Sequence, residues 1–121
     1  MLAKSNRVVR AEDYRGAVRR GRRITSASLV VYVLRRGGDA APRFGFIVSK
    51  AVGNAVTRNL VRRRLKAASY LLLAELAPGM DVVVRALPPA ARLSWVSLQR
   101  ELATTLERAL PTAQHTEVTG G

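Results

Sequence analysis

The feature that most constrains the fold is a long amphipathic segment, residues 55 to about 75, between two short strand-like runs. Its apolar residues recur with the spacing of a helix, and Asn54 directly before it is a suitable N-cap. In the preceding run Phe44, Phe46 and Val48 share one face, and the following run is rich in valine. The sequence therefore predicts a strand, the longest helix of the chain and another strand in succession.

The other elements follow from similar patterns. A first helix begins near Glu12 and Asp13, whose charges suit the positive end of a helix, and stops at Gly21. A last helix is capped by Ser94 and stopped by Pro111. Its predicted inward side consists of Trp95, Leu98, Leu102, Leu106 and Leu110. The predicted elements are helix 11–20, strands 28–35 and 43–50, helix 55–75, strand 80–86 and a helix from about 95 to 110.

Three connections complete this plan. The glycine-rich turn 36–39 predicts that the strands before and after it pair as a hairpin, and Leu87-Pro88-Pro89 is a rigid linker. A short extra strand near 23–26 stays open, so the order is α-β-β-α-β-α or α-β-β-β-α-β-α. We expect residues 1–110 to form a single domain and 111–121 to be a polar, flexible tail.

Positive charge is concentrated in the first part of the chain. The net charge is +13, but residues 1–74 hold 17 Lys and Arg against three acids, a net +14, whereas residues 75–121 sum to −1. Such clustering destabilises a compact fold unless a polyanion compensates it. It favours a nucleic-acid partner over an anionic membrane or an acidic protein.

A helical wheel places most basic residues of the long helix on one side. At about 100° per residue, Arg58, Arg62 and Lys66 lie at about 0°, 40° and 80°, with Asn59 and Arg63 at about 100° and 140°. Cations one turn apart repel each other unless an anion compensates them, and guanidinium groups match phosphates. The predicted core side consists of Val56, Leu60, Val61, Leu65, Ala67, Ala68, Leu71 and Leu72. This pattern indicates an RNA-binding face, with a merely solvated face as the alternative.

Two tyrosines accompany the basic segments. Tyr14 shares an apolar stripe with Ala17 and Val18 on the first helix, and Tyr32 lies in the strand 28–35. Single-stranded nucleic acid stacks on such rings between positive charges. Tyrosine is also common at the boundary of a core, and this second interpretation is the one that the sequence favours.

Catalytic side chains are sparse. The single histidine, His115, lies in the tail, and no cysteine is present. The adjacent carboxylates Glu12 and Asp13 suit the start of a helix better than an acid–base pair. The spacing of metal-ligating residues matches no zinc site. The residues thus predict no catalytic centre and no metal site within the chain.

The central segment contains Val48-Ser49-Lys50, Val52-Gly53-Asn54-Ala55-Val56, Arg58-Asn59 and Arg62-Arg63. This set of residues resembles the signature of the bacterial ribonuclease P protein family. Further matches are Arg7, Glu12-Asp13-Tyr14, Gly21-Arg22, Gly45 and Val82-Val83-Val84-Arg85, so the resemblance covers about residues 6–110. It implies an α+β fold, a small mixed sheet packed by helices like the second domain of ribosomal protein S5. It also implies a left-handed β-α-β crossover, which is rare.

The resemblance also implies a function: a subunit of an endoribonuclease that removes the 5′ leader of precursor tRNA, with chemistry carried by a catalytic RNA and its bound Mg²⁺. The residues implied to bind the catalytic RNA are Lys50, Asn54, Arg58, Asn59, Arg62, Arg63 and Lys66. Tyr14, Val18 and Tyr32 are implied to form the cleft for the leader. The implied partners are the catalytic RNA and precursor tRNA, and the implied location is the cytoplasm.

Three positions depart from these patterns. Leu60 stands where the family has a third basic residue, so the RNA contact of that residue is either absent here or supplied by Arg62 or Arg63. Val18 stands where the family usually has an aromatic ring. Arg64 falls within the apolar arc of the helix, so we expect it to extend its charged head toward solvent or to lie where that arc leaves the core.

Three rival functions are compatible with parts of the pattern. A protein that binds ribosomal RNA shares the charge, size and fold type, but the motif from Lys50 to Arg63 argues against it. A membrane-surface protein needs bulky apolar residues on its amphipathic helix, whereas alanine, valine and leucine suit packing on a sheet. A nuclease that works without RNA needs clustered acidic metal ligands. We therefore expect an RNA-binding protein with no membrane partner.

Overall fold

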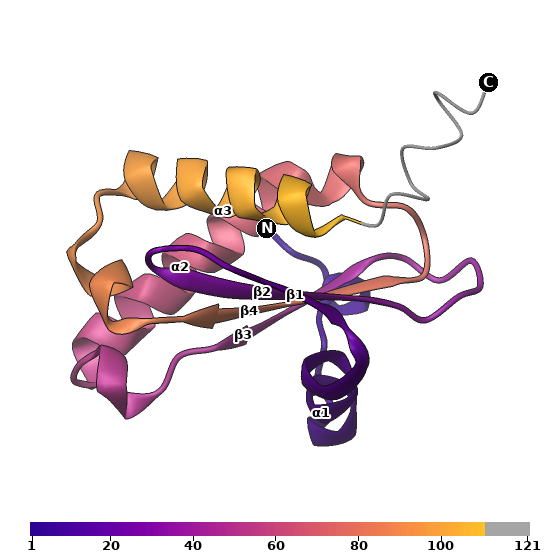
Figure 1. Cartoon of the computed structure of the whole chain (residues 1–121), viewed down its shortest axis with the longest axis horizontal. Helices are drawn as coiled ribbons and strands as arrows, with labels where there is room; N and C mark the ends of the chain where they lie inside the picture. The colour runs from indigo at the N-terminus through magenta and orange to yellow at the C-terminus, as the bar shows by residue number, and fades with distance from the viewer. Residues whose placement is uncertain (111–121) are drawn as a thin grey trace.

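A four-stranded sheet separates two helical layers in the computed structural model, which describes residues 1–110 (Figure 1). The helices are α1 (Ala11–Arg20), α2 (Ala55–Leu72) and α3 (Trp95–Ala109). The strands are β1 (Arg22–Thr25), β2 (Leu29–Arg35), β3 (Arg43–Ile47) and β4 (Met80–Ala86), in the spatial order β1-β2-β4-β3. α2 and α3 cover one face of the sheet, and α1 lies against the other. The α+β class and the short extra strand are thus confirmed, whereas the predicted tail with Pro111 and His115 lies outside the described residues.

The predicted hairpin across the turn 36–39 is wrong. β4 lies between β2 and β3, antiparallel to the first and parallel to the second. The cause is the composition of β4, in which Val82, Val83 and Val84 are all fully buried. A strand that is apolar on both faces needs a partner on each edge and a covering layer on each side. β4 therefore takes a central position, and β3, which ends at Ile47, earlier than predicted, becomes an edge strand.

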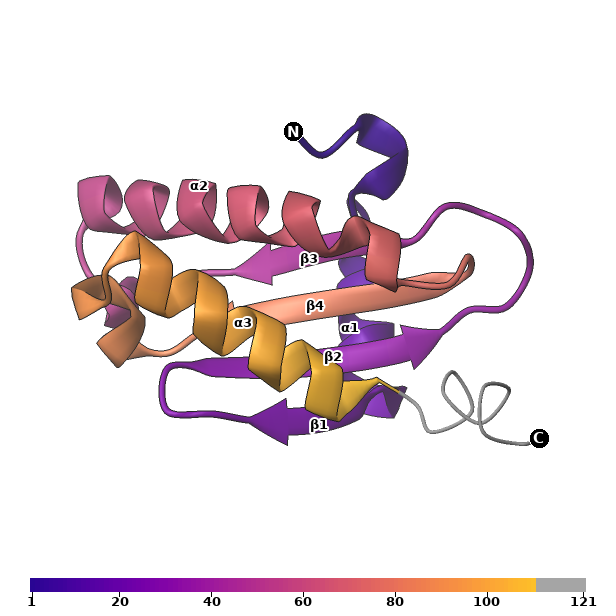
Figure 2. The same cartoon turned by 90° about the horizontal axis from the view of Figure 1, so that it is seen from above.

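The connection from β3 through α2 to β4 joins two parallel neighbours. In Figure 2, seen from the side of α2 and α3, both strands run from right to left and α2 returns in the opposite direction along the edge formed by β3. With the helix toward the viewer this crossover is left-handed, an exception to the usual right-handed rule. Because it carries α2 along the β3 edge, one flank of the helix stays free of the rest of the fold.

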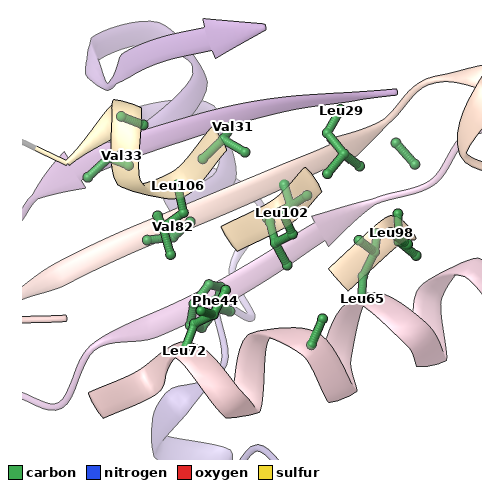
Figure 3. Packing of buried hydrophobic residues seen from close by; sticks show 14 of the residues in the cluster. Leu29, Val31, Val33, Phe44, Leu65, Leu72, Val82, Leu98, Leu102 and Leu106 are labelled. Carbon is green, nitrogen blue, oxygen red and sulfur yellow. The ribbon is translucent and has the colours of Figure 1, made fainter. Parts of the chain in front are cut away.

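The main core lies between the sheet and the layer of α2 and α3 (Figure 3). The labelled side chains are Leu29, Val31, Val33, Phe44 and Val82 from the sheet, with Leu65, Leu72, Leu98, Leu102 and Leu106 from the helices. The predicted inward side of α3 is confirmed for its four leucines, whereas Trp95 is only half-buried. The predicted cap is also confirmed, since the Oγ of Ser94 accepts a 3.1 Å hydrogen bond from the backbone N–H of Ser97.

A smaller cluster fills the contact between α1 and the opposite face of the sheet. It consists of Ala17, Val30, Tyr32 and Val83, with Tyr14, Leu34, Ile47 and Leu87 packed against it. α1 is a single short helix, so it covers only part of this face. The remainder of the face, beside α1, is available to a ligand.

α2 begins where predicted and ends at Leu72, followed by a 3-10 turn over Leu73–Glu75, and its buried side is narrower than predicted. Asn54 caps the helix, with its Oδ1 accepting a 2.9 Å hydrogen bond from the backbone N–H of Thr57. The buried residues are Val61, Leu65, Ala68, Ser69 and Leu72. The prediction that Val56, Leu60, Ala67 and Leu71 face the core is wrong, since all four are exposed. The helix packs along an edge of the sheet with α3 on one side only, so the rest of its apolar arc has no covering layer.

Arg64 lies where that apolar arc meets α3. Its Nη1 donates a 3.0 Å hydrogen bond to the carbonyl oxygen of Leu93, directly before the N-cap of α3. The side chain therefore joins α2 to the loop that begins α3, at the place where the arc leaves the core. Of the two positions expected for Arg64, the structure shows the one at which the apolar arc leaves the core.

Candidate nucleic-acid interface

The basic residues of α2 lie along its flank and its outer side. Arg58, Arg62 and Lys66 are partly buried, whereas Asn59 and Arg63 are exposed. The Nη1 of Arg62 donates a 2.9 Å hydrogen bond to Oδ1 of Asn59, which orients the guanidinium along the helix surface. α2 thus carries all five of these predicted residues on two neighbouring sides of the helix.

The turn before α2 adds the two remaining residues of the predicted set. Lys50 begins a short 3-10 helix, Lys50–Val52, and is exposed, as is Asn54 at the N-cap. The Nε of Arg58 donates a 3.1 Å hydrogen bond to the carbonyl oxygen of Gly53, so this arginine is tied to the turn. The amide oxygen of Asn54 is engaged in capping, which leaves its amide N–H groups for a ligand.

In residues 1–110, the described ion pairs leave this cationic surface without an acidic partner. Among residues 1–110, none of Arg58, Arg62, Arg63 and Lys66 forms an ion pair with a carboxylate. The described ion pairs instead involve Arg10, Arg36 and Arg43. Like charges stacked along one helix destabilise it unless a polyanion is bound. This arrangement therefore fits a partner that supplies several phosphates.

A groove of about 290 Å³ separates the flank of α2 from the edge of β3. It is lined by Arg7, Val8, Val9, Tyr14, Phe44, Phe46, Arg62 and Lys66. The N–H of Val8 donates a 2.8 Å bond to the carbonyl oxygen of Phe44, and the N–H of Phe46 donates a 3.2 Å bond to the hydroxyl of Tyr14. The N-terminal segment and Tyr14 thus occupy the edge of β3. The groove combines aromatic rings with cations, which suits single-stranded nucleic acid.

Five lining residues of this groove are not among the predicted site residues: Arg7, Val8, Val9, Phe44 and Phe46. Of these, Arg7 is part of the family pattern, and Phe46 shares its predicted strand face with Phe44 and Val48. Phe46 is half-buried, with its ring stacked on that of Phe44 at a centroid distance of 6.3 Å. Phe46 lies near the end of β3, and β3 is an edge strand, which accounts for the partial exposure of the Phe46 side chain. Which strand lies at an edge depends on the order of the strands in the sheet, and the sequence pattern does not predict that order.

Tyr14 and Val18 come together on α1, beside a second hollow of about 310 Å³. Arg15, Arg19 and Ile47 complete its lining. Val18 is 41% exposed. Where the family usually has an aromatic ring, this chain therefore presents an exposed aliphatic side chain. Tyr14 lines both this hollow and the groove at the β3 edge.

Tyr32 is not exposed beside them. Only 4% of it is accessible, and it packs with Ala17, Val30 and Val83 beneath α1. This is the core position that the sequence favoured for a tyrosine in this strand. In this structure the ring offers no open face on which a base could stack, so any contact with a leader falls to Tyr14 and Val18.

Neither a metal centre nor a membrane span occurs in the described part of the chain. No three His, Cys, Asp or Glu side chains among residues 1–110 lie where they could together hold a metal ion. This part of the chain therefore offers no such cluster to a protein-held Mg²⁺. In the same residues, no helix is both long and apolar enough to cross a bilayer.

Known proteins resemble this chain along almost all of the described residues. The model of the Ribonuclease P family matches residues 2–110. The chain is 55% identical over 112 residues to the ribonuclease P protein component of Clavibacter michiganensis, covering 93% of this chain and 99% of that protein. It is 47% identical over 120 residues to the ribonuclease P protein component of Streptomyces griseus, covering 91% and 96% of the two chains.

Solved structures agree as well. The RNase P protein of Staphylococcus aureus superposes with a TM-score of 0.78 at 26% identity, over 88% of this chain and 96% of that one. The RNase P protein of Thermotoga maritima superposes with a TM-score of 0.77 over 87% and 98% of the two chains. At 21% identity, this second likeness supports the fold alone.

Proposed function

Because the chain belongs to the ribonuclease P protein family, we propose that it binds the catalytic RNA through α2 and the 5′ leader of precursor tRNA through the aromatic groove and hollow beside α1. In this proposal Lys50, Asn54, Arg58 and Arg62 contact the catalytic RNA, together with Asn59, Arg63 and Lys66. Tyr14 and Val18 contact the leader. The assembled ribonucleoprotein removes the leader by endonucleolytic hydrolysis in the cytoplasm, giving the mature 5′ end.

One observation carries this proposal: a stripe of cations that forms no ion pair within residues 1–110 lies next to a groove that contains aromatic rings. The stripe matches the phosphates of a folded RNA, which the protein contacts largely through backbone and shape. The groove matches an unpaired strand, whose bases stack on rings while its phosphates meet Arg7, Arg62 and Lys66. The two kinds of surface therefore fit two kinds of RNA, a folded one and a single-stranded one.

The protein's own residues supply binding and orientation in this proposal. Mg²⁺, held mainly by the catalytic RNA and the substrate, supplies charge stabilisation and an activated water for phosphodiester hydrolysis when bound. The cations of α2 lower the repulsion between catalytic RNA and substrate, so that less Mg²⁺ is needed for both to come together. Tyr14 holds the leader on the far side of the scissile bond from the tRNA body.

Reconstitution tests the proposal directly. Purified protein is mixed with the catalytic RNA of a bacterial ribonuclease P and a precursor tRNA at low Mg²⁺, and release of the leader is followed. We expect rapid cleavage with the protein and little without it. Equal rates with and without protein would refute the assigned role. Selective co-purification with ribosomal RNA would instead favour a ribosomal partner.

The leader site is tested separately by Tyr14→Ala. Loss of the ring should weaken binding of precursor tRNA by about 1–3 kcal/mol, the scale of one stacked base. Mature tRNA, which has no leader, should bind the assembled enzyme as before. Tyr14→Phe is the matched control, because it keeps the ring and loses only the hydrogen bond to Phe46. Equal losses for precursor and mature tRNA would rule out a leader contact at Tyr14.

A further inference from the structure

The outer side of α2 carries large apolar side chains that stay exposed within the described part of the chain. Tyr70 is 48% exposed and Leu71 is 55% exposed, although both lie within the last turn of the helix. Neither belongs to the hydrophobic clusters of the described residues. Exposed apolar residues that gather in one place commonly mark a binding surface.

Tyr70 and Leu71 help to line a hollow of about 450 Å³, a volume within the range of small-ligand pockets. Ala67 lies at the centre of its α2 wall, between Arg63 and Leu71 along the helix, and its single methyl group leaves the space open. Trp95, at the start of α3, also lines the hollow. Figure 2 shows the N-terminal segment and α3 on opposite sides of α2, so the hollow spans the outer surface of the helix.

The wall opposite α3 is held in place by the N-terminal segment. Leu2 is inserted into the main core, with 3% of it exposed. The Nε and Nη2 of Arg7 donate hydrogen bonds of 3.2 and 2.8 Å to the carbonyl oxygen of Leu2. These contacts fix the conformation of residues 2–7. The hollow that this segment lines is therefore formed without a bound ligand.

All charged residues that line the hollow are cations: Arg7, Arg63 and Lys66. An apolar floor with cationic neighbours suits a nucleotide, whose base is flat and apolar on its faces and whose phosphates are anionic. A second copy of this chain would bring another net charge of +13 toward the same cations, so self-association is disfavoured. An apolar peptide would leave the cations without partners.

We propose that this hollow receives one unpaired base of the catalytic RNA, stacked against Tyr70, with Arg63 and Lys66 on the adjoining phosphates. The inference rests on the proposed function and adds to it a contact that reads an extruded base rather than the backbone alone. It also gives a role to the apolar residues of α2 that do not face the core. Since Arg63 and Lys66 border both the hollow and the cationic stripe, the two contacts are continuous.

The test uses Ala67→Leu, which fills the hollow without removing a charge, and Tyr70→Ala, which removes the ring. Ala67 is exposed, so the core is untouched, and circular dichroism checks that the fold is kept. The matched controls are Ala74→Leu, the same change at an exposed position outside the lining, and Tyr70→Phe, which keeps the ring. Affinity for the catalytic RNA of a bacterial ribonuclease P is measured for each variant.

Trp95 provides an independent readout, because it is the only tryptophan of the chain and lines the hollow. We expect Ala67→Leu and Tyr70→Ala to weaken RNA binding between about fivefold and a hundredfold, the range given by one stacked base. The RNA affinity of both controls should stay within about twofold of the wild-type value, because neither fills the hollow nor removes the ring on which the base stacks. Saturating RNA should change the emission of Trp95 in the wild-type protein and not in Ala67→Leu.

The outcomes separate this inference from the function on which it rests. If Arg62→Ala weakens RNA binding while Ala67→Leu matches wild type in affinity and in Trp95 emission, only the base site is wrong. If Ala67→Leu alters only the sedimentation of the protein, the hollow serves a second copy, and the base site is again wrong. If the wild-type protein fails to bind the catalytic RNA, the proposed function is overturned together with the inference.

Discussion

Arg62 is the residue at which the cationic stripe and the groove meet. It lines the groove at the β3 edge, and its guanidinium is oriented by the hydrogen bond to Asn59. Arg62→Ala should weaken assembly with the catalytic RNA by about 1–2 kcal/mol, the scale of one charge-assisted contact. Filter binding of the protein to the catalytic RNA alone, without substrate, measures this loss.

The matched control for Arg62 is Arg100→Ala. Arg100 is an exposed arginine on α3 that lines neither the groove nor the hollow, so its removal changes the net charge equally. If both variants lose the same affinity, the RNA responds to overall charge and not to the stripe on α2.

Asp81 is a residue whose role is structural. It is 2% exposed, and its carboxylate accepts hydrogen bonds of 2.6 Å from Nε of Arg36 and of 2.9 and 2.7 Å from Nε and Nη2 of Arg43. The hydrogen bond with Asp81 raises the pKa of Arg43, against burial that lowers it, so this arginine keeps its charge. The network ties the connection between β2 and β3 to the central strand β4.

Asp81→Asn should lower the free energy of unfolding by about 2–4 kcal/mol, because it removes the carboxylate that pairs with Arg36 and the nearer of the two that pair with Arg43. Urea denaturation at neutral pH measures this change. Asp39→Asn, an exposed carboxylate in the same connection, should change stability by less than about 0.5 kcal/mol. A small effect at Asp81 would mean that solvent compensates the two arginines.

At the scale of the element, the packing of α1 against β3 depends on Gly45. A Cβ atom at this position would lie 2.7 Å from Cε1 of Tyr14, which is closer than real contacts allow. Gly45→Ala should therefore displace the ring and lower the free energy of unfolding by about 1–3 kcal/mol. The displaced ring should also weaken binding of precursor tRNA more than of mature tRNA.

A double-mutant cycle isolates this contact. In the Tyr14→Ala background, Gly45→Ala should be neutral or slightly stabilising, because the clash is gone and alanine suits a strand better than glycine does. Urea denaturation of the four proteins gives the coupling energy. An unchanged penalty in the Tyr14→Ala background would place the strain in the backbone of β3 rather than at the ring.

At the scale of the whole molecule, the charge distribution predicts a steep dependence of RNA binding on salt. If Arg58, Arg62, Arg63 and Lys66 each neutralise one phosphate, log K should fall by about 3–3.5 per tenfold rise in monovalent salt. Titrations at fixed Mg²⁺ measure this slope. Arg62→Ala should reduce the slope by about one phosphate equivalent, and a nearly flat response would exclude phosphate contacts as the basis of binding.

The proposed division of labour, with binding by the protein and chemistry by the RNA, gives a further prediction for the whole molecule. The carboxylates are scattered, and residues 1–110 bring no metal-ligating group of three together. Purified protein free of RNA should therefore leave precursor tRNA intact at any Mg²⁺ concentration. Cleavage that survives nuclease treatment of the preparation would contradict this expectation.

The sequence by itself determined the local elements and the chemistry of α2. The caps at Asn54 and Ser94, the bounds of α1 and β4, and the stripe from Arg58 to Lys66 depend on residues near each other along the chain. Helical and strand periodicities and capping preferences act over a few residues, so they can be read directly from the order of amino acids. The family motif is likewise contiguous, which is why it is recognisable without a structure.

Only the tertiary structure decided which of these residues are exposed. The place of β4 between β2 and β3 made β3 an edge strand, and this left Phe46 half-buried beside Tyr14. The packing of α1 buried Tyr32, and the edge position of α2 left Ala67 and Leu71 uncovered. Burial depends on which distant segments come to lie against a residue, and hydrophobic periodicity gives the direction of a side chain but not the presence of a covering layer.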